Sequence, residues 1–460
     1  MTTNRYELVS TENPEDAPEE IALVRAPFPE LEEALRDANT KLKEAGSGWR
    51  LELESDGTHG LVLPIKVTYD DAFRSTRHVR DLAGFLAHLR RPIPVLFDRI
   101  LIPSPGHRPN NQGGASYQLG AGARGDFGRV PVAVVANEPP PRTAVSGRRP
   151  VVALLDTAIE PHDWLGEADG HLGGDGFWVD ARSKGWDPGP RLRLPESSER
   201  SELGETEGHG TFSAGLVRQV APDVQVLGVR VIRDDGRVDG DHVLNALDWL
   251  AHEDTDLVAG DVVCVPAGFR PVFPYDRAFL ELLADVLARL ADREIRVVAA
   301  AGNDASSDPV YPAAFAASTG VPEHVRVVSV GATNTDGMTP AYFSNYGDWV
   351  TRWEIGTSVL STFPMVNRLA APEFVAKPQP KDPSHFPVRE SADPDDFVRR
   401  TPTSSSTPPV WEMGEGEVRL TGGFARWSGT SFAAAIHAGK LAQEQIGPLD
   451  DSGAARSDRP

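Results

Sequence analysis

Three short, widely separated stretches of this chain carry the residue types that could perform nucleophilic chemistry. Asp156 ends a continuous apolar run, His209 lies between two glycines, and Ser431 follows Gly-Thr at the start of an alanine-rich segment. A serine hydroxyl is a weak nucleophile at its own pKa and needs a histidine to take its proton. A carboxylate then fixes the tautomer of the histidine and stabilises the imidazolium. The three residues therefore predict acyl transfer if the fold brings them together.

Asn303 could stabilise the negative charge that develops during such a reaction. It follows Ala-Ala-Gly, and its side-chain amide can donate a hydrogen bond without carrying charge. Ser431 is expected at a helix N-terminus, where unpaired N–H groups and the positive end of the helix dipole also favour an oxyanion. The side chain of Asn303 and the backbone N–H of Ser431 are therefore the expected donors.

Asp156, His209 and Ser431 each have a structural interpretation as well. Serine and threonine are preferred helix N-caps, so Gly-Thr-Ser alone favours a cap over a nucleophile. The histidine could be a buried structural residue, and an aspartate that follows a strand is more often a cap or turn residue. No single one of these residues establishes a catalytic site.

The elements that must position these residues alternate between strands and helices. The apolar run at 151–155 is typical of a buried strand in a parallel sheet, since both of its faces are covered. Further strands are expected at 225–231, 262–265, 295–300 and 325–330, and helices at 243–250 and 280–291. This alternation predicts an α/β fold with a mainly parallel sheet and helices on both faces. Ligands bind beyond the carboxyl ends of such strands, where Asp156 is placed.

Composition divides the chain into parts of different character. Low-complexity sequence at 365–425 is expected to be a surface insertion within the main domain. The linker before the main domain could be a processing site or a passive tether. The expected parts are an acidic, disordered N-terminus at 1–20, a small α/β module at 21–103, a Gly- and Pro-rich linker at 104–149, the main domain at 150–446 and a mobile tail at 447–460.

The charge and the cysteine content limit the classes of partner and location. With 67 acidic and 46 basic residues the net charge is −21, which opposes binding to nucleic acid or to an anionic membrane. Cys264 is the only cysteine, so no intrachain disulfide can form. The N-terminus has no apolar core of a secretory signal, and no apolar run is long enough to span a bilayer. We therefore expect a cytoplasmic protein without a nucleic-acid or membrane partner.

Several whole motifs make the chain similar to the subtilisin-like serine proteases. They occur in the chain order of that family and extend over about 150–445. The resemblance implies a subtilisin-like fold for the main domain and a serine endopeptidase that acts on polypeptides and needs no cofactor for its chemistry. The matching segments are 155–159, 208–211, 226–231, 298–303, 311–313, 328–332, 342–347 and 428–434.

The resemblance also assigns roles to individual residues. It implies that Ser431 is the nucleophile, His209 the general base and acid, Asp156 the orienting carboxylate and Asn303 the oxyanion donor. It places the walls of the first specificity pocket at two tripeptides, of which the first also pairs with the backbone of the substrate. These tripeptides are Pro266-Ala267-Gly268 and Ala300-Ala301-Gly302.

The chain departs from the family pattern at several positions. Pro266 replaces the serine of the substrate strand, and proline lacks an N–H donor but keeps its carbonyl. Phe212 replaces a common histidine, a change that we expect to be tolerated. The module at 21–103 does not match the pro-domain of the family and is expected to bind the peptidase domain or a protein partner. These departures leave open a second interpretation, a low-turnover regulatory or peptide-binding protein that retains the protease fold. An esterase is a third option.

Calcium sites are frequent in the family, and two acidic stretches are candidates, at 175–180 and 234–241. Scattered aspartates without an ordered ligand spacing are more often solvated. No metal-ligand motif is present among the twelve histidines, so we expect no metal to take part in the reaction.

Overall fold

The structure of the chain is a computed structural model, which describes the helices and strands given below and most loops of the main domain. Before residue 139, the described residues are those of α1 and β1 to β6. Of the expected disordered segment 1–20, residues 1–19 lie outside the described residues and Glu20 begins β1. Most of the linker and of the insertion, and the expected tail at 447–460, also lie outside them. From residue 139 on, the structure describes residues 139–145, 147–188, 192, 206–233, 238–271, 276–317, 327–364, 369–377, 410–418 and 423–446.

A seven-stranded sheet in the order β15-β14-β13-β11-β7-β9-β8 forms the centre of the main domain. All of its neighbouring strands run parallel. The strands expected from the sequence correspond to β7, β9, β11, β13 and β14, which confirms the predicted fold class. The seven strands are β7 (Val151–Asp156), β8 (Trp178–Asp180), β9 (Gln225–Arg230), β11 (Val262–Val265), β13 (Arg296–Ala300), β14 (Val327–Thr333) and β15 (Arg352–Ile355).

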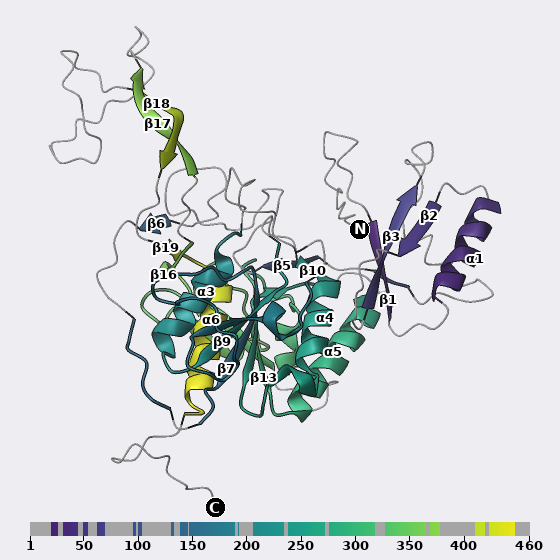
Figure 1. Cartoon of the computed structure of the whole chain (residues 1–460), viewed down its shortest axis with the longest axis horizontal. Helices are drawn as coiled ribbons and strands as arrows, with labels where there is room; N and C mark the ends of the chain where they lie inside the picture. The colour runs from purple at the N-terminus through teal and green to yellow at the C-terminus, as the bar shows by residue number, and fades with distance from the viewer. Residues whose placement is uncertain are drawn as a thin grey trace, which may run out of the picture.

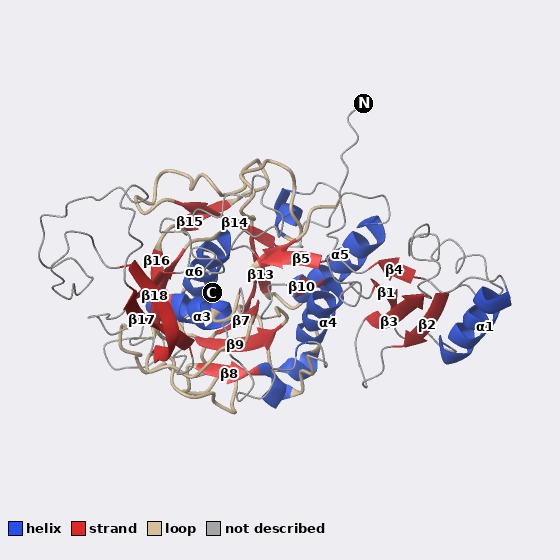
Figure 2. Ribbon diagram, turned by 90° about the horizontal axis from the view of Figure 1, so that it is seen from above, coloured by secondary structure: helices blue, strands red, loops and turns tan. Residues whose placement is uncertain are grey.

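Helices cover both faces of this sheet, because successive residues of β7 are apolar on both sides. Val151, Ala153 and Leu155 belong to a buried cluster with residues of α4 and α5. Val152 and Leu154 belong to another cluster with residues of α3 and α6. Figure 2 shows the two pairs of helices on opposite sides of the sheet. The helices are α3 (His209–Val220), α4 (Gly240–Leu250), α5 (Asp276–Asp292) and α6 (Thr430–Gln443).

The helix that carries Ser431, α6, packs closely against the sheet and against α3. Its packing face is built of small residues, so that the helix axis can approach its neighbours. A Cβ atom on Gly439 would lie 3.0 Å from Cγ2 of Val220 on α3, so this glycine sets how near the two helices lie. The fully buried alanines of α6 are Ala433, Ala434, Ala435, Ala438 and Ala442.

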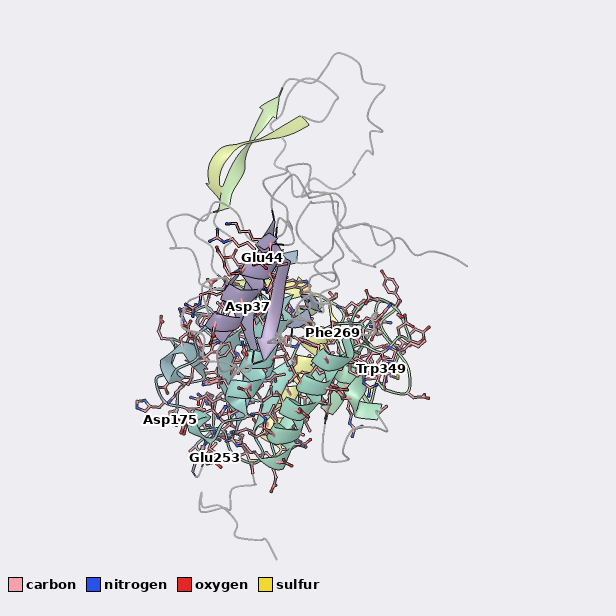
Figure 3. All side chains as sticks on the ribbon, turned by 90° about the vertical axis from the view of Figure 1, so that its right-hand side faces the viewer. Asp37, Glu44, Asp175, Glu253, Phe269 and Trp349 are labelled. Carbon is pink, nitrogen blue, oxygen red and sulfur yellow. The ribbon has the colours of Figure 1, made fainter. Side chains whose placement is uncertain are left out.

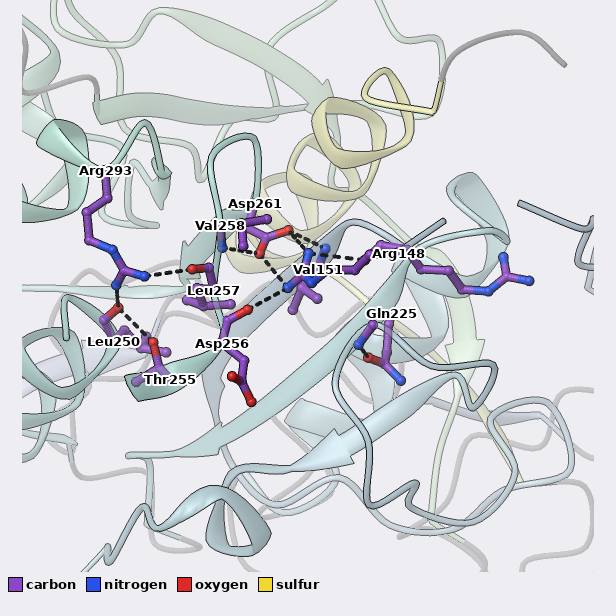
Figure 4. Close-up of polar contacts among 12 residues, drawn as sticks. Arg148, Val151, Gln225, Leu250, Thr255, Asp256, Leu257, Val258, Asp261 and Arg293 are labelled. Carbon is purple, nitrogen blue, oxygen red and sulfur yellow. Dashed lines mark hydrogen bonds and ion pairs between the residues drawn. The ribbon is translucent and has the colours of Figure 1, made fainter. Parts of the chain in front are cut away.

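A buried carboxylate fixes the beginning of β7, and thereby the position of Asp156 at its end. Asp261 accepts hydrogen bonds from the backbone N–H of Val151 at 2.8 Å and of Val258 at 2.9 Å. Its two oxygens also accept from the guanidinium of Arg148 at 3.0 and 2.8 Å (Figure 4). A buried charge is tolerated when it is paired and hydrogen-bonded in this way. The contacts tie the entry of β7 to the loop before β11, its neighbour in the sheet.

A small α/β module precedes the main domain (Figure 1). It is an antiparallel sheet in the order β2-β3-β1-β4 together with the helix α1. Ala34, Leu35, Ala38 and Leu42 of α1 are buried at helical spacing, which explains why this segment forms a helix. The elements are β1 (Glu20–Arg25), α1 (Leu31–Glu44), β2 (Trp49–Leu53), β3 (Val62–Tyr69) and β4 (Val95–Phe97).

The strand that follows the module, β5 (Ile100–Pro103), pairs with two strands of the main domain. It lies between β10 (Val238–Asp239) and β12 (Ala267–Gly268), antiparallel to both. In the pairing with β12, Pro103 lies opposite Ala267 and Ile102 opposite Gly268. A segment of the chain from before the main domain therefore pairs with the strand that was expected to bind substrate.

The remaining described elements are a small sheet, a two-stranded ribbon and three short 3-10 helices. A further antiparallel sheet has the order β16-β19-β6, in which β6 comes from the expected linker. A two-stranded antiparallel ribbon, β17 and β18, lies within the expected insertion and projects away from the main sheet (Figure 1). The bounds are β6 (Val130–Val132), β16 (Val359–Thr362), β17 (Leu369–Lys377), β18 (Val410–Val418) and β19 (Phe424–Trp427), with short 3-10 helices at Ala181–Lys184, Glu253–Thr255 and Ala313–Ala317.

Candidate active site

Asp156 and His209 form a fully buried hydrogen-bonded pair at the carboxyl edge of the sheet. Asp156 is the last residue of β7 and His209 the first residue of α3. Nδ1 of the imidazole lies 2.7 Å from Oδ1 of the carboxylate, and neither side chain is exposed. The same carboxylate oxygen also accepts from the backbone N–H of Thr157 at 2.6 Å. Because the carboxylate only accepts, the Nδ1 atom carries a proton and Nε2 remains able to accept one.

The positions on both sides of His209 have no room for a side chain, which explains why both are glycines. Gly208 has φ of 82°, and a Cβ atom there would lie 2.7 Å from side-chain atoms of Phe363 and Pro364. A Cβ atom on Gly210 would lie 2.4 Å from the carbonyl oxygen of Thr157. A larger residue at position 210 would push the start of α3 away from the end of β7 and separate the imidazole from Asp156.

Aromatic rings hold the imidazole of His209 from its other side. Its ring centroid lies 4.9 Å from that of Phe432 and 5.4 Å from that of Trp427. Phe212 packs against the same two rings at 4.6 and 5.6 Å. The phenylalanine at position 212 thus becomes part of the support of the histidine, in a buried cluster with Trp427 and Phe432.

Ser431 lies at the beginning of α6, directly before Phe432, and its side chain is fully buried. Its hydroxyl donates to the carbonyl oxygen of Pro266 at 3.0 Å. Among the described residues, Nε2 of His209 has no hydrogen-bond partner. The structure therefore unites Asp156 with His209, and Phe432, the residue after Ser431, packs against the imidazole, but the serine hydroxyl is turned to Pro266.

The side chain of Asn303 is fixed through its oxygen, which leaves its N–H₂ group able to donate to another acceptor. Its Oδ1 accepts from the backbone N–H of Thr430 at 2.9 Å, and Oγ1 of Thr430 accepts from the backbone N–H of Gly302 at 3.0 Å. Nδ2 of Asn303 is buried and has no partner among the described residues. The two bonds connect Thr430, the residue before Ser431, with Asn303 itself and with Gly302 before it, so both expected oxyanion donors are fixed relative to each other.

Sequence reasoning did not identify Asn345 and Thr430 as positioning residues. Oδ1 of Asn345 accepts from the backbone N–H of Asp304 at 2.9 Å and of Ser306 at 3.1 Å. Its Nδ2 donates to the carbonyl of Ala301 at 2.9 Å. Asn345 thereby braces the loop that presents Asn303. The available signal was its place in the segment 342–347, which matched the family motif without an assigned role.

The two tripeptides expected to line the first specificity pocket lie at the carboxyl ends of two neighbouring strands, β11 and β13. Val265 pairs with Ala299 in the parallel ladder between β11 and β13, so Pro266 and Ala300 continue from neighbouring positions at the carboxyl edge. Gly302 has φ of 100° and turns the chain after Ala300 and Ala301 toward Asn303. The expected walls therefore lie side by side, close to Ser431.

Cys264 is buried in β11, and its environment keeps it out of nucleophilic chemistry. Burial, and secondly the carboxylate of Asp156, raise the pKa of this thiol far above its ordinary value. The thiol thus stays protonated.

The acidic stretches proposed as calcium sites have other contacts in the described residues. Asp175 is fully exposed (Figure 3) and lies 3.5 Å from Nη2 of Arg149, and Asp180 pairs with Arg182. Carboxylates of Asp239 and Asp241 gather with His242, but Nη1 of Arg233 lies 3.9 Å from Asp239. Residues 234–237 lie outside the described residues. Structural calcium and the independence of the reaction from metals both stay predictions.

Comparison with known proteins gives a match to a family model, described as the Subtilase family, over residues 147–445. The minor extracellular protease Epr of Bacillus subtilis is 25% identical over 232 residues, which are 48% of this chain and 29% of that protein. Subtilisin BL of Lederbergia lenta is 30% identical over 166 residues, 34% of this chain and 54% of that protein. The chain thus spans less than two thirds of the length of these relatives.

A solved structure, that of a cold adapted subtilisin-like serine proteinase, aligns with 71% of this chain and 94% of that chain at 18% identity and a TM-score of 0.37. In the part of this chain that the structure describes, no helix is both long and apolar enough to cross a membrane.

Proposed function

The chain belongs to the subtilase family, and from this premise we propose that it is a serine endopeptidase that hydrolyses polypeptides through an acyl-enzyme on Ser431. The observation that carries the proposal is the buried pair of His209 and Asp156, with Nδ1 and Oδ1 at 2.7 Å. A carboxylate in this position holds the imidazole in the tautomer that can take a proton at Nε2. In the proposal this proton comes from the hydroxyl of Ser431, whose neighbour Phe432 packs against the imidazole.

In the proposed reaction, Ser431 attacks the carbonyl carbon of a peptide bond and His209 takes the hydroxyl proton. A rotation about the Cα–Cβ bond of Ser431 first moves Oγ from the carbonyl of Pro266 toward Nε2 of His209. The amide of Asn303 and the backbone N–H of Ser431 donate to the oxyanion of the tetrahedral intermediate. His209 then protonates the leaving amine, and water, activated by the same imidazole, releases the acyl group.

The substrate would bind by adding a strand beside β12. Strand addition supplies affinity through backbone hydrogen bonds and specificity through side-chain pockets. The position of β5, antiparallel to Ala267 and Gly268, supports this mode because it is an extended segment on the same strand. We propose that the N-terminal part of the chain is the expected partner of the peptidase domain and occupies the substrate strand until it is displaced.

A second candidate function is a peptide-binding protein with low turnover. The hydrogen bond from Ser431 to Pro266 favours it, because the hydroxyl is not directed at the base. The complete set of Asp156, His209 and Asn303 favours the endopeptidase. The expected cytoplasmic location stays a prediction, and the name of one relative, Epr, describes an extracellular protease.

Labelling with a serine-directed fluorophosphonate and hydrolysis of unfolded casein test the proposed function. We expect labelling and casein cleavage by the wild-type chain and loss of both in Ser431→Ala. The exposed Ser183→Ala is the matched control. Labelling without turnover would favour the peptide-binding function, whereas undiminished cleavage by Ser431→Ala would overturn the proposed nucleophile.

A further inference from the structure

We propose that β16 fixes the first turn of α3 relative to the loop that precedes α6, and that Ser361 and Thr362 are positioning residues that act on the reaction through His209. This inference rests on the proposed function and adds residues that govern its rate. Both residues lie outside the segments that resemble the family motifs, and both are fully buried.

The chain at the start of β16 is bonded to the loop that presents Ser431. The carbonyl of Gly356 accepts from the backbone N–H of Gly429 at 2.8 Å. The backbone N–H of Ser358 donates to Oγ of Ser428 at 2.8 Å. A Cβ atom on Gly356 would lie 2.7 Å from the carbonyl oxygen of Gly429, so the two segments are in close contact. One end of β16 is therefore tied to the residues directly before the nucleophile helix.

The other end of β16 is bonded to the first turn of α3, the helix that begins with His209 (Figures 1 and 2). Oγ1 of Thr362 donates to the carbonyl of Thr211 at 2.7 Å. Oγ of Ser361 donates to the carbonyl of Phe212, also at 2.7 Å. Two consecutive side chains of one strand thus hold two consecutive carbonyls of the helix, which fixes the position of α3 along its own axis.

The contact between β16 and α3 leaves little room for adjustment. A Cβ atom on Gly215 of α3 would overlap the hydroxyls of both strand residues. Beyond the strand, the side chains of Phe363 and Pro364 each have an atom 2.7 Å from where a Cβ atom on Gly208 would lie. The consecutive residues 361–364 therefore line the start of α3, and a change in their volume or hydrogen bonding displaces it.

The neighbouring strand β19 completes the connection between base and nucleophile. It pairs with β16 over the whole length of that strand. Its last residue, Trp427, packs edge-on against the imidazole of His209, with ring centroids 5.4 Å apart. A displacement of α3 against this frame moves the imidazole relative to Ser431. In enzymes a misplacement of about 1 Å can cost about 10²-fold in rate.

Replacing Thr362 by valine tests the inference, because the two side chains have the same shape. A methyl group needs about 3.3–3.6 Å from a carbonyl oxygen, whereas Oγ1 of Thr362 lies 2.7 Å from that of Thr211. Valine therefore displaces the first turn of α3. We expect kcat on a peptide substrate to fall at least about tenfold, with KM within about twofold of the wild type. The kcat is referred to the sites titrated by exhaustive fluorophosphonate labelling, so that a smaller folded fraction does not lower it.

Two further variants separate the hydroxyl from the fold. Thr362→Ser keeps the hydroxyl and should retain the wild-type kcat. Thr255→Val is the matched control, because it removes a buried hydroxyl that donates to the carbonyl of His252, beyond the end of α4, at 2.8 Å. Its kcat per titrated site should equal that of the wild type.

A wild-type kcat in Thr362→Val, or an equal loss in Thr362→Ser, would overturn the inference. If Thr362→Val does not fold, Ser361→Ala takes its place, because it removes a hydroxyl without adding volume. It should lower kcat at unchanged KM, and an unchanged kcat would overturn the inference as well. Absence of any fluorophosphonate labelling of the wild type would instead overturn the proposed function, and the inference with it.

Discussion

The hydroxyl of Ser431 donates to the carbonyl oxygen of Pro266 at 3.0 Å, while Nε2 of His209 has no partner among the described residues. Leaving Pro266 costs one hydrogen bond, about 0.5–1.5 kcal/mol net, and a bond to His209 replaces it. Enzymes lower reaction barriers by about 8–23 kcal/mol, so this reorientation is a small term. The observed rotamer is therefore compatible with an active enzyme that reorients its nucleophile when substrate binds.

Replacing Asp156 by asparagine should abolish most turnover while leaving the fold intact. An asparagine amide can donate to Nδ1, which favours the tautomer that carries its proton on Nε2 and cannot act as a base. The expected loss in kcat is about 10⁴-fold. The measurement is kcat on a peptide substrate, with thermal unfolding to verify the fold. The control is Asp169→Asn, which alters an Asp–His pair with His171 at the surface. A loss of less than tenfold in Asp156→Asn would contradict the assigned role.

Replacing Asn303 by alanine should lower kcat about 10²- to 10³-fold with little change in KM. The reason is that Nδ2 donates to an oxyanion that exists only in the transition state. The control Asn334→Ala removes an exposed amide that bonds Thr339. A raised KM at unchanged kcat would show instead that Asn303 binds the ground state of the substrate.

Replacing Ile102 by proline should increase activity, because it weakens the pairing of β5. This strand pairs with β10 through Ile100 and Leu101 and with β12 through Ile102 and Pro103. Proline removes one N–H. Loss of a hydrogen bond of about 1 kcal/mol corresponds to a roughly fivefold rise in kcat/KM for a competing peptide. The control is Arg36→Ala on α1. Unchanged or reduced activity of a folded Ile102→Pro variant would refute the proposal that the N-terminal part occupies the substrate strand.

The sequence predicted the elements that carry the site better than the contacts within it. Asp156, His209 and Ser431 could be placed because each follows a local pattern, an apolar strand, a Gly-His-Gly turn or the start of an alanine-rich helix. The pairing of Ile102 with Gly268 joins residues far apart in the chain, and no local pattern encodes it. Asn345 was missed for the same reason, since only the folded chain brings it to the loop that presents Asn303.

The last prediction concerns His162, a buried histidine outside the catalytic residues. Its Nδ1 accepts from the backbone N–H of Trp164 at 3.0 Å, and its Nε2 lies 2.8 Å from the carbonyl of Gly423, directly before β19. Both contacts fit a neutral ring that is protonated at Nε2. Burial lowers the pKa of His162 below its ordinary value of 6.5, against the opposing effects of the Gly423 carbonyl and Asp163.

Because the folded pKa is the lower one, the unfolded chain takes up this proton first as the pH falls. The free energy of unfolding should therefore decrease from pH 6.5, the ordinary pKa, down to the pKa of the folded state, below which this contribution is lost. Urea unfolding at pH values above and below this window should show that the free energy of unfolding falls less in His162→Gln than in the wild type. The exposed His171→Gln should behave as the wild type does. An identical pH dependence of His162→Gln and wild type would contradict the prediction, since the other titrating groups are common to both proteins.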